Sequence, residues 1–201
     1  MSKVFKFGGA SVKNPKAIYN LKEIVSSYKE NLVIVISAID KTTNKLELVW
    51  KSYLGNETLK SIEIATEIIK FHEAIIDELE LNNNAGFLKL FNDLTLELVD
   101  YIGAKTKQEN NISYSKIVSF GELFSTLIIS SYLNKEGVEN QWIDAREFIK
   151  TSKSATDSSV NWEETKRKIN SSLSKGKSYL TQGFIGSNLN GETTTLGREG
   201  S

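Results

Sequence analysis

A continuous run of five branched apolar residues, Leu32–Ile36 (LVIVI), constrains the fold more than any other segment. Such a run is typical of a parallel-sheet strand that is covered on both faces. Upstream, Val4–Phe7 is a short β-type run, and Asn14-Pro15 predicts the start of a helix whose apolar residues recur at helical spacing. Strand, helix and strand form a βαβ unit, which implies parallel pairing and a right-handed crossover.

Further helical and strand patterns follow along the chain. Apolar residues recur at helical spacing over residues 62–79, 87–102, 116–133 and 162–173. Brief β-type runs lie at residues 141–143 and 178–181. These patterns predict an α/β domain with a mainly parallel sheet and helices on both sides. Because ligands bind at the carboxyl ends of the strands in such sheets, we expect the polar segments after the strands to converge there.

The composition is that of an ordinary globular protein. The 201 residues include 25 basic and 25 acidic side chains, a balance that gives no argument for a nucleic-acid or membrane partner. Cysteine is absent, which excludes disulfides, thiolate metal sites and a cysteine nucleophile. No apolar run approaches the ~20 residues that span a bilayer, and no signal peptide follows Met1. We therefore expect a cytoplasmic protein with no metal-ligating cluster of its own.

The first strand ends in a lysine and two glycines, Lys6, Gly8 and Gly9. Glycines let backbone N–H groups approach an anion, and the following helix favours negative charge at its N-terminus. A lysine on the strand adds positive charge suited to phosphoryl transfer. The same residues also occur at plain strand–turn–helix corners, and the chain has neither a GxxxxGK[ST] loop nor a GxGxxG fingerprint.

The loop after the second strand, Ser37–Asn44, gathers hydroxyls, an amide and charges. Its Ser and Thr side chains and backbone N–H groups could hydrogen-bond a carboxylate or a phosphate. Alternatively, Asp40 or Thr42 could simply cap the next helix.

Glu122 lies in an otherwise apolar helical stretch that includes Val118, Leu123 and Phe124. A carboxylate in this position either extends to water or faces a cation, such as the amino group of a bound amino acid. The pattern alone favours the solvated carboxylate, because Glu is rarely buried.

The stretch from Thr181 to Ser201 is rich in Gly, Thr and Ser and has few residues that usually form a core. Its single arginine, Arg198, provides a planar pair of donors for a carboxylate. This composition, with the apolar Phe184, indicates binding more than packing, although a flexible loop or hairpin would look similar.

Four segments together resemble the aspartokinases of the amino-acid-kinase superfamily. They are KFGGAS at Lys6–Ser11, SAIDKTTN at Ser37–Asn44, SFGEL at Ser119–Leu123 and TQGFIGSNLNGETTTLGREGS at Thr181–Ser201. Their order and spacing follow the family, and the GFIG…GxTTTLGR pattern is the most specific. Two residues depart from the family pattern: Ala10 stands in place of a threonine and Glu199 in place of a glycine.

The resemblance implies an α/β/α sandwich and a reaction in which Mg-ATP phosphorylates the side-chain carboxylate of L-aspartate. This reaction is the first step towards lysine, threonine and methionine. By the same resemblance, Lys6, Gly8 and Gly9 would hold the transferring phosphoryl group, with Ser37 nearby. Catalysis would rest on positioning and charge, since the substrate carboxylate itself attacks the phosphorus.

The resemblance also implies a set of substrate-binding residues. Thr43 would lie at the aspartate β-carboxylate, and Glu122 would pair with the α-ammonium group. Arg198 would bind the α-carboxylate, Phe184 would form a wall of the site, and Ser201 would make a further contact.

Aspartokinases continue past the position of Ser201 with a nucleotide-binding half and usually with ACT domains. We therefore expect residues 1–201 to be the N-terminal, amino-acid-binding part of the kinase domain, inactive alone, from a protein that forms homo-oligomers. Two alternatives stay open: a non-catalytic binding or assembly module, and a kinase of another acceptor such as glutamate, acetylglutamate or carbamate. Acetylglutamate has a blocked amine and would leave Glu122 unpaired.

Overall fold

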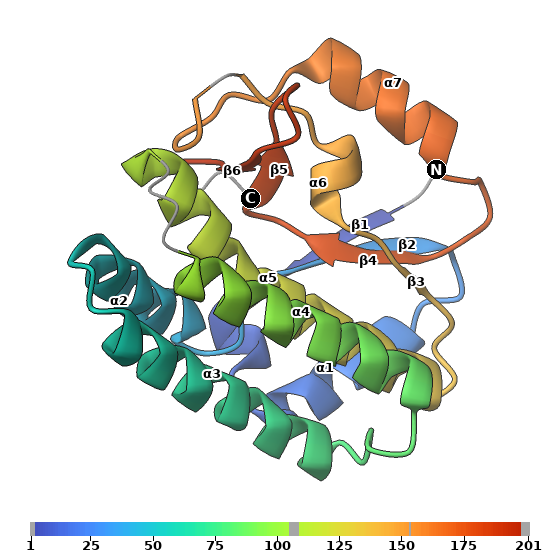
Figure 1. Ribbon diagram of the computed structural model, residues 1–201. Helices are drawn as coiled ribbons and strands as arrows, with labels where there is room; N and C mark the ends of the chain where they lie inside the picture. The colour runs from blue at the N-terminus through green and yellow to red at the C-terminus, as the bar shows by residue number, and fades with distance from the viewer. Residues whose placement is uncertain (1–2, 105–108, 153, 198–201) are drawn as a thin grey trace.

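The computed structural model describes residues 3–104, 109–152 and 154–197, and within them helices enclose a parallel sheet (Figure 1). The elements are β1 (Lys3–Phe7), the 3-10 helix η1 (Gly9–Val12), α1 (Pro15–Ser26), β2 (Leu32–Ile36), α2 (Thr42–Leu54), α3 (Thr58–Glu78), α4 (Ala85–Gly103), α5 (Asn110–Lys135), β3 (Gln141–Trp142), α6 (Ala145–Phe148), α7 (Trp162–Ser172), β4 (Tyr179–Gln182), β5 (Ile185–Ser187) and β6 (Thr193–Thr195). The α/β architecture predicted from the sequence is confirmed.

The main sheet has the strand order β1-β2-β4-β3, and every pair in it is parallel. Phe7, Ile36 and Gln182 are partners in the last row of β1, β2 and β4. The chain segments that follow these three strands therefore leave the sheet side by side. This is the predicted convergence at the carboxyl edge, where ligands bind in such sheets.

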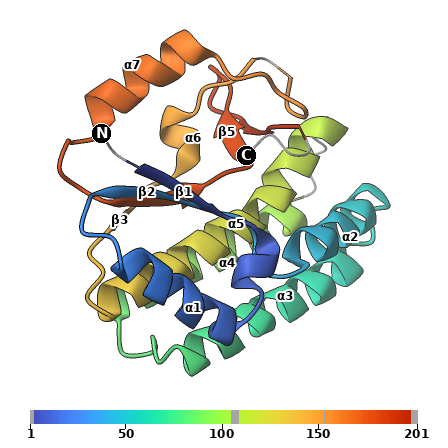
Figure 2. The same cartoon turned by 180° about the vertical axis from the view of Figure 1, so that it is seen from behind.

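Helices α1 to α5 lie on one side of the sheet, and α6, α7 and the β5–β6 hairpin lie on the other (Figures 1 and 2). Leu32, Ile34 and Ile36 lie on one face of β2 and are fully buried, whereas Val33 and Val35 on its other face are half-buried. The second face is thus covered less completely than the apolar run predicts. The edge strand β1 shows the same incomplete cover, since Val4, the partner of Val33, is 65% exposed.

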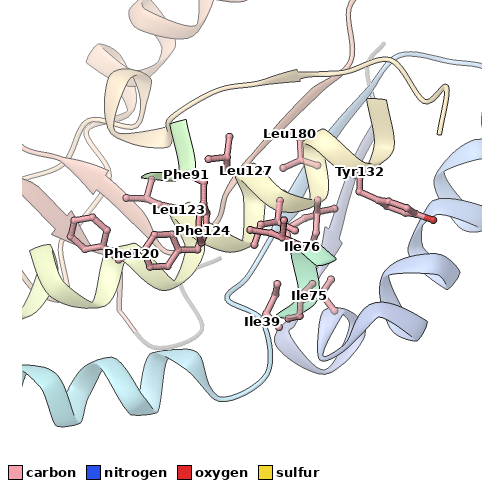
Figure 3. Packing of buried hydrophobic residues seen from close by; sticks show 14 of the residues in the cluster. Ile39, Ile75, Ile76, Phe91, Phe120, Leu123, Phe124, Leu127, Tyr132 and Leu180 are labelled. Carbon is pink, nitrogen blue, oxygen red and sulfur yellow. The ribbon is translucent and has the colours of Figure 1, made fainter. Parts of the chain in front are cut away.

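Helix α5 runs through the centre of the molecule and supplies much of its core (Figure 3). Phe120 and Phe124 are fully buried, and the ring of Phe91 from α4 lies 5.4 Å from that of Phe124. By length and composition α5 could cross a membrane, but 83% of its most apolar window is buried inside the domain, as in the central helix of a packed fold. The helix begins at Asn110, six residues earlier than its apolar pattern predicts, and in its first turn the hydroxyl of Ser113 donates to the carbonyl oxygen of Asn110 (2.9 Å).

His72 is a fully buried titratable residue on α3 within the same core. The Nδ1–H group of His72 donates a hydrogen bond to the carbonyl oxygen of Ile68 (2.8 Å). Its Nε2 has no hydrogen-bond partner among the described residues. Burial lowers the pKa of His72 from 6.5 to about 4, since the charged ring would lose its hydration. The imidazole is therefore a neutral core group.

Replacing His72 with leucine should make the fold less sensitive to acid. As the pH falls, His72 is protonated in the unfolded state before it is protonated in the folded state. The wild-type protein therefore loses, between pH 6.5 and pH 4, stability that it has above pH 6.5. Between pH 7.5 and pH 5 the unfolding free energy of His72→Leu should gain about 2 kcal/mol relative to wild type. Denaturant titrations at the two pH values measure this, and an equal difference at both would contradict it.

Candidate active site

Glu122 lies at the point where α5 meets the turn between β4 and β5. Its Oε2 accepts hydrogen bonds from the backbone N–H groups of Gly183 (3.0 Å) and Phe184 (2.9 Å). The residue is only 4% exposed, so the solvated carboxylate favoured by the sequence pattern is wrong. The physical reason is that two backbone donors from a distant part of the chain replace water around one of its oxygens.

The electrostatic environment leaves Glu122 close to half-ionised at neutral pH. Burial raises its pKa from 4.5 to about 7. The hydrogen bonds from Phe184 and Gly183 and the charge of Lys6 on β1 act in the opposite direction. A buried carboxyl group with such a pKa becomes fully ionised when a cation arrives beside it, which is the behaviour required of an ammonium-binding residue.

Gly121 explains why a glycine precedes this carboxylate. A Cβ atom at position 121 would lie 3.1 Å from the Cβ of Ala38 and 3.2 Å from a methyl group of Leu46. The glycine thus lets α5 approach both the loop after β2 and helix α2. This close packing brings Glu122 to the carboxyl edge of the sheet.

The two glycines after β1 differ in their surroundings. A Cβ at Gly9 would lie 3.0 Å from the carbonyl oxygen of Ala38, so Gly9 is needed for the close approach of two loops. At Gly8 nothing lies within 4 Å of such an atom, which leaves its backbone open to a ligand. The helix that follows is the four-residue η1, so the positive charge here comes mainly from the exposed Lys6 rather than from a long helix dipole.

The loop after β2 is fixed by hydrogen bonds to its neighbours. Ser37 donates its N–H to Phe7 (3.1 Å), and its carbonyl accepts from Ser125 of α5 (2.7 Å). The proposed capping by Asp40 or Thr42 is wrong: the N-cap position is Lys41, and the hydroxyl of Thr42 donates back to a carbonyl. Thr43 is half-buried in the first turn of α2, at the same edge of the sheet.

The segment after β4 forms an antiparallel hairpin of β5 and β6, and all six strand residues are buried. The expectation that it contributes little to the core is therefore wrong. Its threonine hydroxyls pair with hydroxyls elsewhere: Thr194 with Thr151 (2.9 Å) and Thr195 with Ser115 (3.1 Å). Arg198 and Ser201, two predicted substrate-binding residues, lie outside the described residues.

Phe184 begins this hairpin and borders a cavity of about 300 Å³. Trp50 of α2 and Tyr114 of α5 line it from the helical side, and their rings meet edge to face at 5.1 Å. Leu196 lines it from the hairpin. Phe184, whose backbone N–H binds Glu122, thus lines a cavity of a size that suits a small molecule. Its role as a wall of the substrate site stays a prediction.

Lys6, Gly8, Ser37, Thr43, Glu122 and Phe184 thus come from four parts of the chain that meet at the carboxyl edge of a parallel sheet. A buried carboxylate acted on by the charge of a lysine, together with a glycine that has open space beside it, is an arrangement typical of a binding site for charged small molecules. The comparisons with known proteins agree with this class. The chain belongs to the amino acid kinase family, whose model matches residues 1–201.

Several relatives are aspartokinases, which confirms the resemblance found in the sequence. Lysine-sensitive aspartokinase 3 of Escherichia coli (strain K12) is 31% identical over 98% of this chain and 44% of its own length. Bifunctional aspartokinase/homoserine dehydrogenase 2 of the same organism is 27% identical over 98% of this chain and 24% of its own length. The chain therefore spans less than half of either relative.

Solved structures of E. coli aspartokinase III match the whole chain. The complex with lysine and aspartate (T-state) has a TM-score of 0.83 at 30% identity, and the complex with aspartate and ADP (R-state) has 0.81 at 28%. In both cases the match covers 44% of the larger protein. The three-layer α/β/α fold expected from the resemblance is confirmed.

Substitution of Glu122 by glutamine should stabilise the ligand-free fold at alkaline pH. The folded pKa lies above the unfolded one, so the stability present below pH 4.5 is lost as the pH rises through about 7. Relative to wild type, Glu122→Gln should gain about 3 kcal/mol of unfolding free energy between pH 4.5 and pH 8. Denaturant titrations of both proteins at these pH values measure the gain. Glu164→Gln on α7 should show no such gain, because the hydrogen bond from Arg167 lowers the pKa of Glu164 rather than raising it.

Proposed function

We propose that the chain is the N-terminal, amino-acid-binding part of an aspartokinase. The reaction transfers the γ-phosphoryl group of ATP to the side-chain carboxylate of L-aspartate and gives 4-phospho-L-aspartate and ADP. The observation that carries the proposal is the buried Glu122, held by two backbone N–H groups next to Lys6. Aspartokinase III of E. coli, which matches the whole chain, has been solved with aspartate and ADP.

Glu122 binds the α-ammonium group of the substrate in this proposal. The approach of the cation lowers the pKa of the carboxyl group, so its proton leaves and an ion pair forms in a water-poor environment. Gly183 and Phe184 already occupy Oε2, which leaves the other oxygen for the substrate. Arg198, whose role comes from the family resemblance, completes the recognition by binding the α-carboxylate, and Ser201 makes a further contact.

The reacting groups meet at the ends of β1 and β2. Thr43 donates to the aspartate β-carboxylate, which attacks the γ-phosphorus while the bond to the bridging oxygen of ADP breaks. Lys6 and the backbone of Gly8 and Gly9 stabilise the charge on the transferring group, with Ser37 nearby. No protein nucleophile takes part, so the contribution of the chain is orientation and charge.

ATP is a co-substrate and brings magnesium with it. The described residues include no group of three or more His, Asp or Glu side chains that could hold a metal ion. In kinases Mg²⁺ is usually held by the substrate phosphates together with one or two carboxylates and water. We further propose that the complete protein is a cytoplasmic homo-oligomer that catalyses the first step towards lysine, threonine and methionine.

The complete product of the gene should convert L-aspartate and Mg-ATP to aspartyl phosphate, which hydroxylamine traps as the hydroxamate. Glu122→Gln should lower kcat/KM for aspartate by roughly 100-fold, because it removes one partner of a buried ion pair. Glu164→Gln on α7, which removes a carboxylate that pairs with the exposed Arg167, is the matched control and should keep wild-type kinetics. Absence of hydroxamate with wild-type enzyme would sink the proposal.

Acceptor choice and binding are tested separately. Glutamate and acetylglutamate in the same assay identify a different acceptor if either exceeds aspartate in kcat/KM. Calorimetry on the 201-residue chain should show binding of L-aspartate. Aspartate binding by the chain together with no phosphorylation by the complete gene product would favour the non-catalytic module.

A further inference from the structure

Thr126 lies one helical turn after Glu122 on α5, and its hydroxyl is the centre of a buried set of hydrogen bonds. It accepts from Nε1 of Trp142 (2.9 Å) and from Nε2 of Gln182 (2.6 Å). It donates to the carbonyl oxygen of Glu122 (2.7 Å). A hydroxyl has one donor and two acceptor positions, so all of its capacity is used.

Gln182 is the last residue of β4 and is 3% exposed. Its Oε1 accepts from the backbone N–H of Ala145, at the start of α6, at 2.7 Å. Because a backbone N–H can only donate, the oxygen must face α6, and the amide nitrogen must face Thr126. The side chain thus has one orientation and links β4, α5 and α6.

This bridge directly precedes the two donors that hold Glu122. Gly183 and Phe184 follow Gln182 in the chain, and both donate to Oε2 of Glu122. Hydrogen bonds therefore join helix α5 to the end of β4 at Thr126 and to the two residues after β4 at Glu122, one helical turn apart. Since hydrogen bonds weaken steeply as their angle and length change, movement of Gln182 would weaken both bonds to Glu122.

We propose that Thr126 and Gln182 are positioning residues for Glu122. Their bridge holds the Gly183 and Phe184 N–H groups in place and so sets how readily the carboxylate forms and binds the ammonium group of an amino-acid substrate. The substrate half of this inference rests on the proposed function, whereas the effect on Glu122 itself does not. Lys6, the charged side chain that acts on Glu122, is unchanged in every variant below.

The first measurement needs no substrate. In the ligand-free chain, carbon NMR of the Glu122 side-chain carboxyl group follows its titration in wild type, Thr126→Val and Thr126→Ser. Valine removes the hydroxyl at nearly constant shape, so the pKa of Glu122 should rise by about one unit as its two backbone bonds loosen. Serine keeps the hydroxyl and should restore the wild-type value.

The second measurement is L-aspartate affinity by calorimetry at two pH values. A rise of one pKa unit from about 7 predicts binding about fivefold weaker in Thr126→Val than in wild type at pH 7, recovering at pH 8.5 where both carboxyl groups are mostly ionised. Gln182→Met removes the amide that donates to Thr126 and should show the same weaker binding at pH 7 and the same recovery at pH 8.5. The control is Thr66→Val on α3, whose hydroxyl likewise bonds the carbonyl four residues back and whose loss should leave both readouts unchanged.

Thermal melts establish that each variant is folded, and Gln182→Met replaces Thr126→Val if the latter does not fold. An unchanged Glu122 pKa in the folded variants would overturn the positioning role. Weaker binding by the same factor at both pH values would also overturn it, because general loosening of the site has no pH dependence of this kind. A raised pKa with unchanged aspartate affinity would leave the positioning role intact and refute the substrate role of Glu122.

Discussion

The hydrogen bonds from Gly183 and Phe184 to Glu122 are the interaction on which the candidate site depends. An isolated carboxylate in the core would be protonated or exposed, because burial without compensation is too costly. Here two backbone donors at the end of β4 make the buried position tolerable. The same contact fixes where the β5–β6 hairpin begins, so the wall formed by Phe184 and the carboxylate share one anchor.

Around this anchor, small residues determine how closely the surrounding elements approach. Gly121 lets Ala38 and Leu46 pack closely against α5. Gly9 lets the loop after β2, which contains Ala38, pack closely against the end of β1. A side chain at either position would push the loop after β2 away from Glu122. The spacing between the carboxylate and the polar strand ends is therefore set by backbone contact rather than by long, flexible side chains.

The sequence predicts the parts of this arrangement that depend on local pattern. The apolar run at Leu32–Ile36 and the helical spacing before it imply a βαβ unit, and parallel pairing then brings the strand ends together. The burial of Glu122 could not be predicted from its neighbours, because its donors are 61 and 62 residues away in the chain. The burial of the hairpin could not be predicted for the same reason: the hydroxyl of Thr194 pairs with that of Thr151, which lies 43 residues earlier in the chain.

Glu122 and His72 are both buried, and burial disfavours the charged form of each, so it raises the pKa of the acid and lowers the pKa of the base. His72 is neutral above its lowered pKa, so its burial is compatible with stability at neutral pH. Glu122 has a raised pKa and destabilises the ligand-free fold as it ionises. A hydrophobic residue at position 122 would avoid this cost, so packing alone does not explain the carboxylate. In the proposed function, the ammonium group of the substrate pairs with Glu122 and restores this stability, so that folding of the site is linked to substrate binding.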